Sequence, residues 1–198
     1  MTLYPTEQWL DVYKRRLNES ESLDESGAGW GIDFNGDIYF VITDLPLDET
    51  TLGDLPDEAL EGLPEQLQEQ LADIPLDSAN NLIDENIRQH MPDQSRDLLR
   101  QIDEDIVDGT IYAFIGLKDG GCTEVDVVDD PDERDVGFRL RGNHEMWRDL
   151  VDGEIEPISA VMSGDLEVEG DMQKILQYSD ATTLLGEIAA DTETTHLF

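Results

Sequence analysis

One interruption in the strand pattern constrains this chain more than any other feature. Residues 38–43 (IYFVIT) and 111–117 (IYAFIGL) are rich in β-branched and aromatic side chains, which predicts two buried strands. Between them, residues 45–108 contain no aromatic residue but five of the eight prolines. Apolar side chains recur at helical spacing between these prolines, so we expect two or three short amphipathic helices. A fold that pairs the two strands has to accommodate this helical segment.

The rest of the chain predicts further strands and helices. An apolar stripe at helical spacing predicts a helix over residues 5–18. Alternating apolar residues predict strands over 123–128 and 136–140, which we expect to continue from 111–117 as an antiparallel meander. Two helices, a short strand at 166–168 and a final helix over 172–190 should follow. The fold class is therefore α+β, with an antiparallel β-sheet covered by helices and a helical insertion, residues 45–108, within a single domain, residues 1–198.

The charge of the chain is extreme and is spread along its length. There are 48 acidic and 12 basic residues, and the net charge is −36. Disorder is disfavoured because 38% of the residues are hydrophobic and fall in periodic runs. An acidic tail is disfavoured because the acids form no terminal block. We expect a halophilic, acidic protein, because molar salt screens charge repulsion within about 3 Å.

The same composition excludes several classes of protein. A nucleic-acid partner needs clustered Lys and Arg, so we expect none. No segment approaches the roughly 18 apolar residues of a membrane span, so no stable membrane insertion is expected. Cys122 is the single cysteine and cannot form an internal disulfide. The first residues lack the features of a signal peptide, so we expect a cytoplasmic protein.

Motifs for catalysis or metal binding are absent from the sequence. There is no GxSxG, P-loop, GxGxxG or HExxH sequence, and the three histidines lie far apart. Asp33, Asn35 and Asp37 imitate the start of a calcium loop, but Ile38 stands where that loop needs glycine. We therefore expect no catalytic residue, no cofactor and no metal.

The segment from residue 143 to 190 carries the most informative pattern. Met146, Met162 and Met172 lie on predicted helices around one short strand, which indicates an adaptable apolar surface. Gly164 and Gly170 flank that strand and allow sharp turns, and Asp171 is placed to cap the following helix. Ordered along this segment are Trp147, Leu150, Gly153, Pro157, Met162, Ser163, Gly164, Leu166, Gly170 and Asp171.

This ordered run resembles the C-terminal signature of the sterol carrier protein type two domain family. The sequences PTEQWL at 5–10, Gly29-Trp30 and DDPD at 129–132 are also similar to a stand-alone branch of that family. The resemblance covers about residues 1–43 and 109–190. Residues 45–108 depart from it, because compact members of the family have a short connection there.

The resemblance implies a sheet roofed by helices that encloses an apolar tunnel for lipids. We therefore expect a soluble carrier, not an enzyme, that holds a lipid or other long apolar ligand. In a salt-accumulating archaeon, an isoprenoid or quinone-like molecule is favoured over a sterol as the ligand. Each candidate cavity residue has ordinary core packing as its alternative; the candidates are Trp147, Leu150, Ile158, Val161, Met162, Met172, Ile175, Leu176 and Leu184.

Three other functions stay open at this point. The chain could be an accessory module that delivers or shelters an isoprenoid quinone for a membrane-bound pathway. It could be an interaction protein whose cavity is filled by its own side chains and whose residues 45–108 dock a protein partner or form a homodimer. It could also be an enzyme, in which case loss of turnover on changing His144 or Glu145 would show it.

Overall fold

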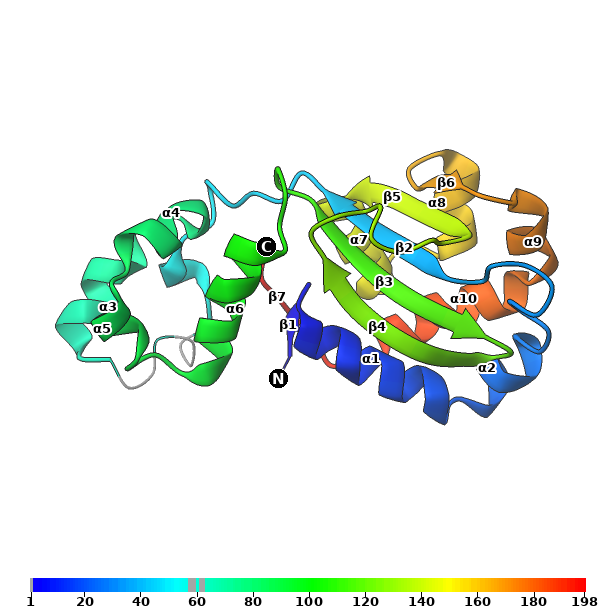
Figure 1. Ribbon diagram of the computed structural model, residues 1–198, viewed down its shortest axis with the longest axis horizontal. Helices are drawn as coiled ribbons and strands as arrows, with labels where there is room; N and C mark the ends of the chain where they lie inside the picture. The colour runs from blue at the N-terminus through cyan, green and yellow to red at the C-terminus, as the bar shows by residue number, and fades with distance from the viewer. Residues whose placement is uncertain (1, 57–59, 61–62) are drawn as a thin grey trace.

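The computed structural model describes residues 2–56, 60 and 63–198. The predicted helical segment includes residues 57–59, 61 and 62, which lie outside this range. Figure 1 shows a body built on a β-sheet, with a group of helices at one end of it. Both chain ends lie near the junction between the body and these helices.

The body contains a five-stranded sheet of mixed direction. Its strands follow the order β4-β3-β2-β5-β6, and every neighbouring pair is antiparallel except β2 and β5, which are parallel. This architecture confirms the predicted α+β class. The strands are β2 (Ile38–Thr43), β3 (Ile111–Lys118), β4 (Gly121–Val128), β5 (Phe138–Asn143) and β6 (Glu167–Glu169).

The predicted meander is wrong at its third strand. β5 pairs with β2 on the far side of β3, not with β4. The connection 129–137 crosses the outer face of the sheet, where Val136 packs on a cluster that includes Tyr39 and Phe114. Arg134 holds the crossing in place, with ion pairs to β4 and its guanidinium 4.5 Å from the Phe114 ring centre. Alternation of apolar residues is the same in either arrangement, so the sequence pattern does not distinguish them.

Helices cover the inner face of the sheet and form the main core with it. The predicted final helix is divided at Tyr178 into two helices. Gly164, with a φ of 86°, ends α8, and the Asp171 side chain accepts a hydrogen bond from the Gln173 N–H to cap α9. The body helices are α1 (Glu7–Glu19), α2 (Glu21–Ser26), α7 (His144–Val151), α8 (Pro157–Ser163), α9 (Met172–Gln177) and α10 (Ser179–Ala190).

The segment between β2 and β3 folds into short helices with a core of their own. The prolines predicted to separate helices do so: Pro64, Pro75 and Pro92 each directly precede one. Aliphatic side chains such as Leu76 and Leu99 are fully buried in this second core. The elements are a 3₁₀ turn (Leu52–Asp54), α3 (Glu65–Ala72), α4 (Leu76–Leu82), α5 (Glu85–Arg88) and α6 (Asp93–Glu104).

Two short strands that the sequence pattern did not predict join the ends of the described chain. β1 (Leu3–Tyr4) pairs in parallel with β7 (Thr195–His196). Leu3 belongs to the core of the helical segment, whereas Tyr4 belongs to the core of the body. This small sheet therefore lies between the two cores.

Candidate functional site

An apolar pocket lies between the inner face of the sheet and the helices that cover it. Its volume is about 60 Å³, taken as the space in which the centre of a water molecule can move. The sheet contributes Phe40, Ile42, Ile111, Ala113, Val127 and Leu140. The helices contribute, among others, Trp9, Leu10 and Tyr13 from α1, Trp147, Leu150 and Val151 from α7, and Thr182, Leu185, Gly186 and Ala189 from α10.

Small side chains explain why space remains between α10 and the sheet. Thr182, Gly186 and Ala189 share one face of α10, and Ala113 of β3 lines the opposite wall. α10 is held close to α8 at Gly186, where a Cβ atom would lie 2.6 Å from the Pro157 Cγ. Short side chains on both walls leave a gap that the large aromatic rings beside it do not fill.

The polar atoms of three aromatic lining residues, Trp9, Tyr13 and Trp147, are hydrogen-bonded within the protein. The Trp9 Nε1–H donates to the Thr194 Oγ1 at 2.8 Å, and the Trp147 Nε1–H donates to the Val41 carbonyl at 3.0 Å. The Tyr13 hydroxyl donates to the Leu185 carbonyl at 2.9 Å. Burial raises the pKa of Tyr4 and of Tyr13, so both phenols stay neutral. The lining is therefore uncharged and suited to hydrocarbon.

A second apolar pocket, with a volume of about 40 Å³, adjoins the first along the sheet. The two pockets share Leu140, Thr182 and Leu185, which form the partition between them. The second pocket continues toward the other end of the sheet, where Trp30 and Leu117 line it. Rotation of the shared side chains would join the pockets into one elongated apolar space.

The structure places the sequence-predicted cavity residues in three different settings. Trp147 and Leu150 line the first pocket, and Ile175 lines the second. Ile158, Val161 and Leu184 are partly buried against the main core but line neither pocket. Met162 is 73% exposed, Leu176 is 48% exposed and Met172 is 36% exposed, and none of them lines either pocket.

Sequence reasoning missed the contribution of α1 and of the sheet. Trp9, Leu10 and Tyr13 belong to a stripe that predicted a buried helix face, but burial does not distinguish a packed wall from a pocket wall. The available signal was residue size. Small residues recur on the buried face of α10, and Ala113 stands among large side chains in β3.

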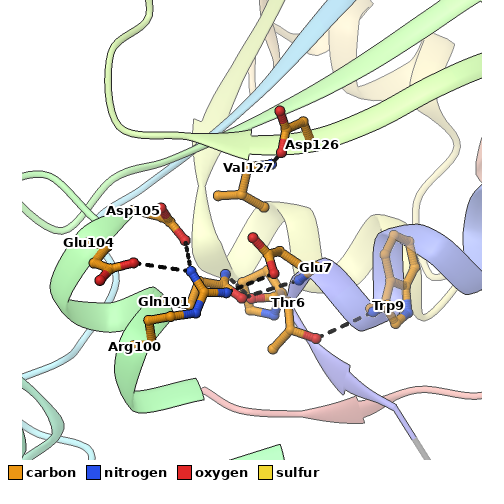
Figure 2. A network of polar contacts seen from close by, with 10 residues as sticks. Thr6, Glu7, Trp9, Arg100, Gln101, Glu104, Asp105, Asp126 and Val127 are labelled. Carbon is orange, nitrogen blue, oxygen red and sulfur yellow. Dashed lines mark hydrogen bonds and ion pairs between the residues drawn. The ribbon is translucent and has the colours of Figure 1, made fainter. Parts of the chain in front are cut away.

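The helical segment meets the body next to the pocket, at the N-terminus of α1 (Figure 2). Buried Gln101 of α6 accepts a hydrogen bond from the Glu7 N–H at 3.1 Å and donates one to the Pro5 carbonyl at 3.3 Å. Beside it, Arg100 pairs with Glu7 at 2.9 Å. Pro5 and Thr6 line the pocket, so α6 supports part of its wall.

Catalytic chemistry has little support in the described part of the chain. No group of three His, Cys, Asp or Glu residues there could hold a metal ion. Cys122 is buried, and burial raises the pKa of its thiol to about 11, which keeps the thiol protonated at neutral pH. Within the same described residues, no helix is long and apolar enough to span a membrane.

Part of the chain matches a known protein family. Residues 85–182 match the SCP-2 sterol transfer family. These are 98 of the 198 residues, so just under half of the chain resembles that family. The SCP-2 match begins at Glu85 and so includes α5 and α6, whereas α1 lies before it.

Two solved structures are similar in fold to this chain. A sterol carrier protein 2 superposes with a TM-score of 0.56 at 18% identity, and the match covers 95% of this chain and 98% of that one. A conserved hypothetical protein from Thermus thermophilus also gives 0.56, at 19% identity, covering 96% of this chain and 90% of that one. A search of curated proteins finds no match. The interpretation of residues 45–108 as an insertion stays a prediction.

Proposed function

We propose that this protein is a non-enzymatic carrier that holds one long apolar chain between the sheet and helices α1, α7 and α10. The observation that carries the proposal is the uncharged apolar pocket, in which the polar atoms of Trp9, Tyr13 and Trp147 are hydrogen-bonded within the protein. The SCP-2 family match supports the same role. The helical segment would act as part of the wall, through the contacts of Gln101 with α1.

The size of the pocket favours a thin, flexible ligand. A volume of about 60 Å³ admits a few carbon atoms, so a ligand has to displace side chains as it enters. A flexible acyl or isoprenoid chain can follow the line of the two adjoining pockets by moving Leu140 and Leu185. A rigid fused-ring molecule would require the sheet and α10 to separate. We therefore favour a single hydrocarbon chain over a sterol.

The hydrophobic effect supplies the binding energy in this mechanism. Each CH₂ group removed from water contributes about 0.8 kcal/mol, less the cost of rearranging the wall. Eight methylene groups would therefore contribute about 6 kcal/mol before that cost. Release would follow from the same effect, because the hydrocarbon ligand can move to another apolar environment without a net loss of free energy.

The first experiment identifies the cargo directly. Protein purified in molar salt is extracted with organic solvent, and the extract is analysed by mass spectrometry against a denatured control. One lipid in stoichiometric amount is the expected result. Protein that is empty and also fails to bind any added long-chain lipid would overturn the proposal.

A pair of variants tests the location of the ligand. Ala113→Leu fills the pocket from the β3 wall and should reduce lipid binding at least tenfold. Met162→Trp adds bulk at a residue that is exposed and lines neither pocket, so binding should stay at the wild-type level. The reverse pattern would place the ligand beside Met162 of α8, one of the candidate cavity residues of the sequence analysis.

An interaction protein is the alternative if no lipid binds. Leu82 and Val107 are the exposed large apolar residues of the described helical segment, at 62% and 43% exposure. A stable complex or homodimer that is lost on changing Leu82 to Ser would support this alternative. Sedimentation of the purified protein at several concentrations distinguishes a dimer from a monomer.

A further inference from the structure

Polar side chains of α6 hold the start of α1 at the junction between the two regions (Figure 2). Gln101 bonds to the Glu7 N–H and to the Pro5 carbonyl, and Arg100 pairs with the Glu7 carboxylate. Pro5 and its neighbour Thr6 also line the main apolar pocket. A change that weakens these contacts therefore acts on one wall of that pocket.

Asp105 directly follows α6 at this junction and is poorly satisfied as an anion. Its side chain is 16% exposed, and its Oδ2 has no hydrogen-bond partner among the described residues. The guanidinium of Arg100 lies 3.7 Å from that oxygen, but it is shared with Glu7 and Glu104. Burial without hydrogen bonds disfavours the charged form of a carboxyl group. The closed junction therefore favours Asp105 in its neutral form.

Burial is the main cause that raises the pKa of Asp105 to about 6, and the surrounding charges add to it. Asp126 of β4, which Figure 2 also shows, pairs with Arg134 instead. Of the charges that act on Asp105, the single cation lowers its pKa and the three anions raise it. These charges are Arg100 and Glu104 of α6, Glu7 of α1, and Asp129 of the connection after β4.

We propose that Asp105 is a pH-dependent switch whose ionisation releases α6 from the start of α1 and loosens the pocket wall at Pro5 and Thr6. In the neutral state, Asp105 does not repel Glu7 and the junction keeps its hydrogen bonds. In the ionised state, the carboxylate gains water by leaving the junction, and the end of α6 moves with it. The switch itself does not depend on the proposed function, but its effect on a ligand does.

The sign of the pH dependence follows from the direction of the shift. The pKa is higher in the closed junction than in water, so protonation favours the closed state. That preference is complete below about pH 4 and is lost as the pH rises through about 6. Opening should therefore become more frequent as the pH rises, and ligand exchange should become faster.

Hydrogen exchange at the Glu7 amide tests the switch without a ligand, because this N–H donates to Gln101 across the junction. Its protection is measured by NMR in molar salt between pH 5 and pH 7 and corrected for intrinsic exchange. If opening relieves the whole pKa shift, the opening constant should rise about tenfold over this range. A change of less than twofold would overturn the proposal.

Three variants separate titration of Asp105 from a general loss of structure. Asp105→Asn keeps the shape of the neutral side chain, so opening should stay infrequent at every pH. Asp103→Asn, at an exposed position of α6, should keep the wild-type dependence. Arg100→Gln removes the cation that lowers the pKa of Asp105, so the midpoint of opening should move to higher pH. A merely structural role of Arg100 would increase opening at every pH without moving the midpoint.

Release of radiolabelled hexadecanol into excess phosphatidylcholine vesicles extends the test to the pocket. Hexadecanol has no group that titrates in this range, so pH acts on the protein alone. The release rate should rise with pH in the wild type, with the midpoint seen by hydrogen exchange, and should stay constant in Asp105→Asn. Thermal melts in the same salt confirm that each variant is folded.

The outcomes separate the switch from the proposed function. Exchange at the Glu7 amide that has the same pH dependence in the wild type and in Asp105→Asn would overturn the switch and leave the carrier intact. Exchange that follows the prediction while hexadecanol release does not would overturn the effect on the pocket wall. Hexadecanol that fails to bind at any pH would count against the proposed function, and hydrogen exchange alone would then decide the switch.

Discussion

The body and the helical segment are both built around apolar cores, but the apolar pocket between the sheet and its helices belongs to the body's core. The body core contains all three tryptophans and two buried tyrosines beside small residues of α10 and β3. The segment core is aliphatic, formed by short helices whose Leu and Ile side chains interlock. Large rigid rings next to small residues leave gaps, whereas flexible aliphatic chains fill them. The comparison indicates that ligand space depends on the mixture of side-chain sizes, not on the amount of apolar surface.

The largest expected effect tests this comparison by truncating one leucine in each core. Leu99→Ala should lower the free energy of unfolding by about 4 kcal/mol, because Leu99 is buried in the dense segment core. Leu140→Ala should cost about 2 kcal/mol, because Leu140 already borders both pockets and has fewer contacts to lose. Urea denaturation in molar salt measures both values. Equal losses would mean that the body is as densely packed as the segment.

The sequence predicted most elements of both regions because local patterns determine them. β2 was predicted with its observed bounds, and Asp171 caps α9 as expected, its side chain accepting from the Gln173 N–H. The strand order was not predictable in the same way. Apolar alternation assigns a face to each strand but not a neighbour, so the crossing held by Arg134 was missed.

The candidate site was less predictable than the fold for a related reason. Trp147 and Leu150 belong to the family signature and line the pocket, but Met162 from the same signature is exposed, as is Leu176, a further candidate on the final helix. Helical spacing gives the buried face of a helix, and a pocket is a property of two faces together. Ala113 and Gly186 come from distant parts of the chain, and only folding shows that they lie across one gap.

The next effect concerns the junction between the two regions. Gln101→Ala should lower the free energy of unfolding by about 3 kcal/mol, because it leaves the buried Glu7 N–H and Pro5 carbonyl without their partner. Gln177→Ala, at an exposed position of α9, should change stability very little. Hydrogen exchange should show faster opening at the start of α1 in Gln101→Ala. Unchanged exchange there would mean that the two regions are held together elsewhere.

A smaller effect should appear as a pH dependence at the same junction. Burial, with a further contribution from the charge of Glu7, raises the pKa of Asp105 to about 6. Because the folded pKa lies above its ordinary value, the stabilisation from protonated Asp105 is present below about pH 4 and is lost as the pH rises through 6. As the pH rises from about 4 to 6, the free energy of unfolding of Asp105→Asn should therefore increase by about 2 kcal/mol relative to that of the wild type. This difference should persist at pH 7.

The measurement is the difference between the two unfolding free energies at each pH, in constant molar salt. Taking the difference cancels the pH dependence of the many other carboxylates. Asp103→Asn, two residues earlier at an exposed position of α6, is the matched control and should give a flat difference. A flat difference for Asp105→Asn as well would show that water reaches this carboxylate freely.

Glu7→Gln should give the smallest change in stability. The same variant is also the most direct test of whether the two regions interact electrostatically. Glu7 and Arg100 are 42% and 41% exposed, so removing their ion pair should cost about 0.5 kcal/mol or less in molar salt. The same change removes a negative charge that raises the pKa of Asp105, and it leaves Arg100, 3.7 Å from Asp105, without its Glu7 partner. The pKa of Asp105, followed by carboxyl NMR, should therefore fall while stability barely moves. A lower pKa of Asp105 would show that the charge of Glu7, at the start of α1, affects the helical segment in addition to forming its ion pair with Arg100. An unchanged pKa would mean that the charge of Glu7 does not contribute to the raised pKa of Asp105.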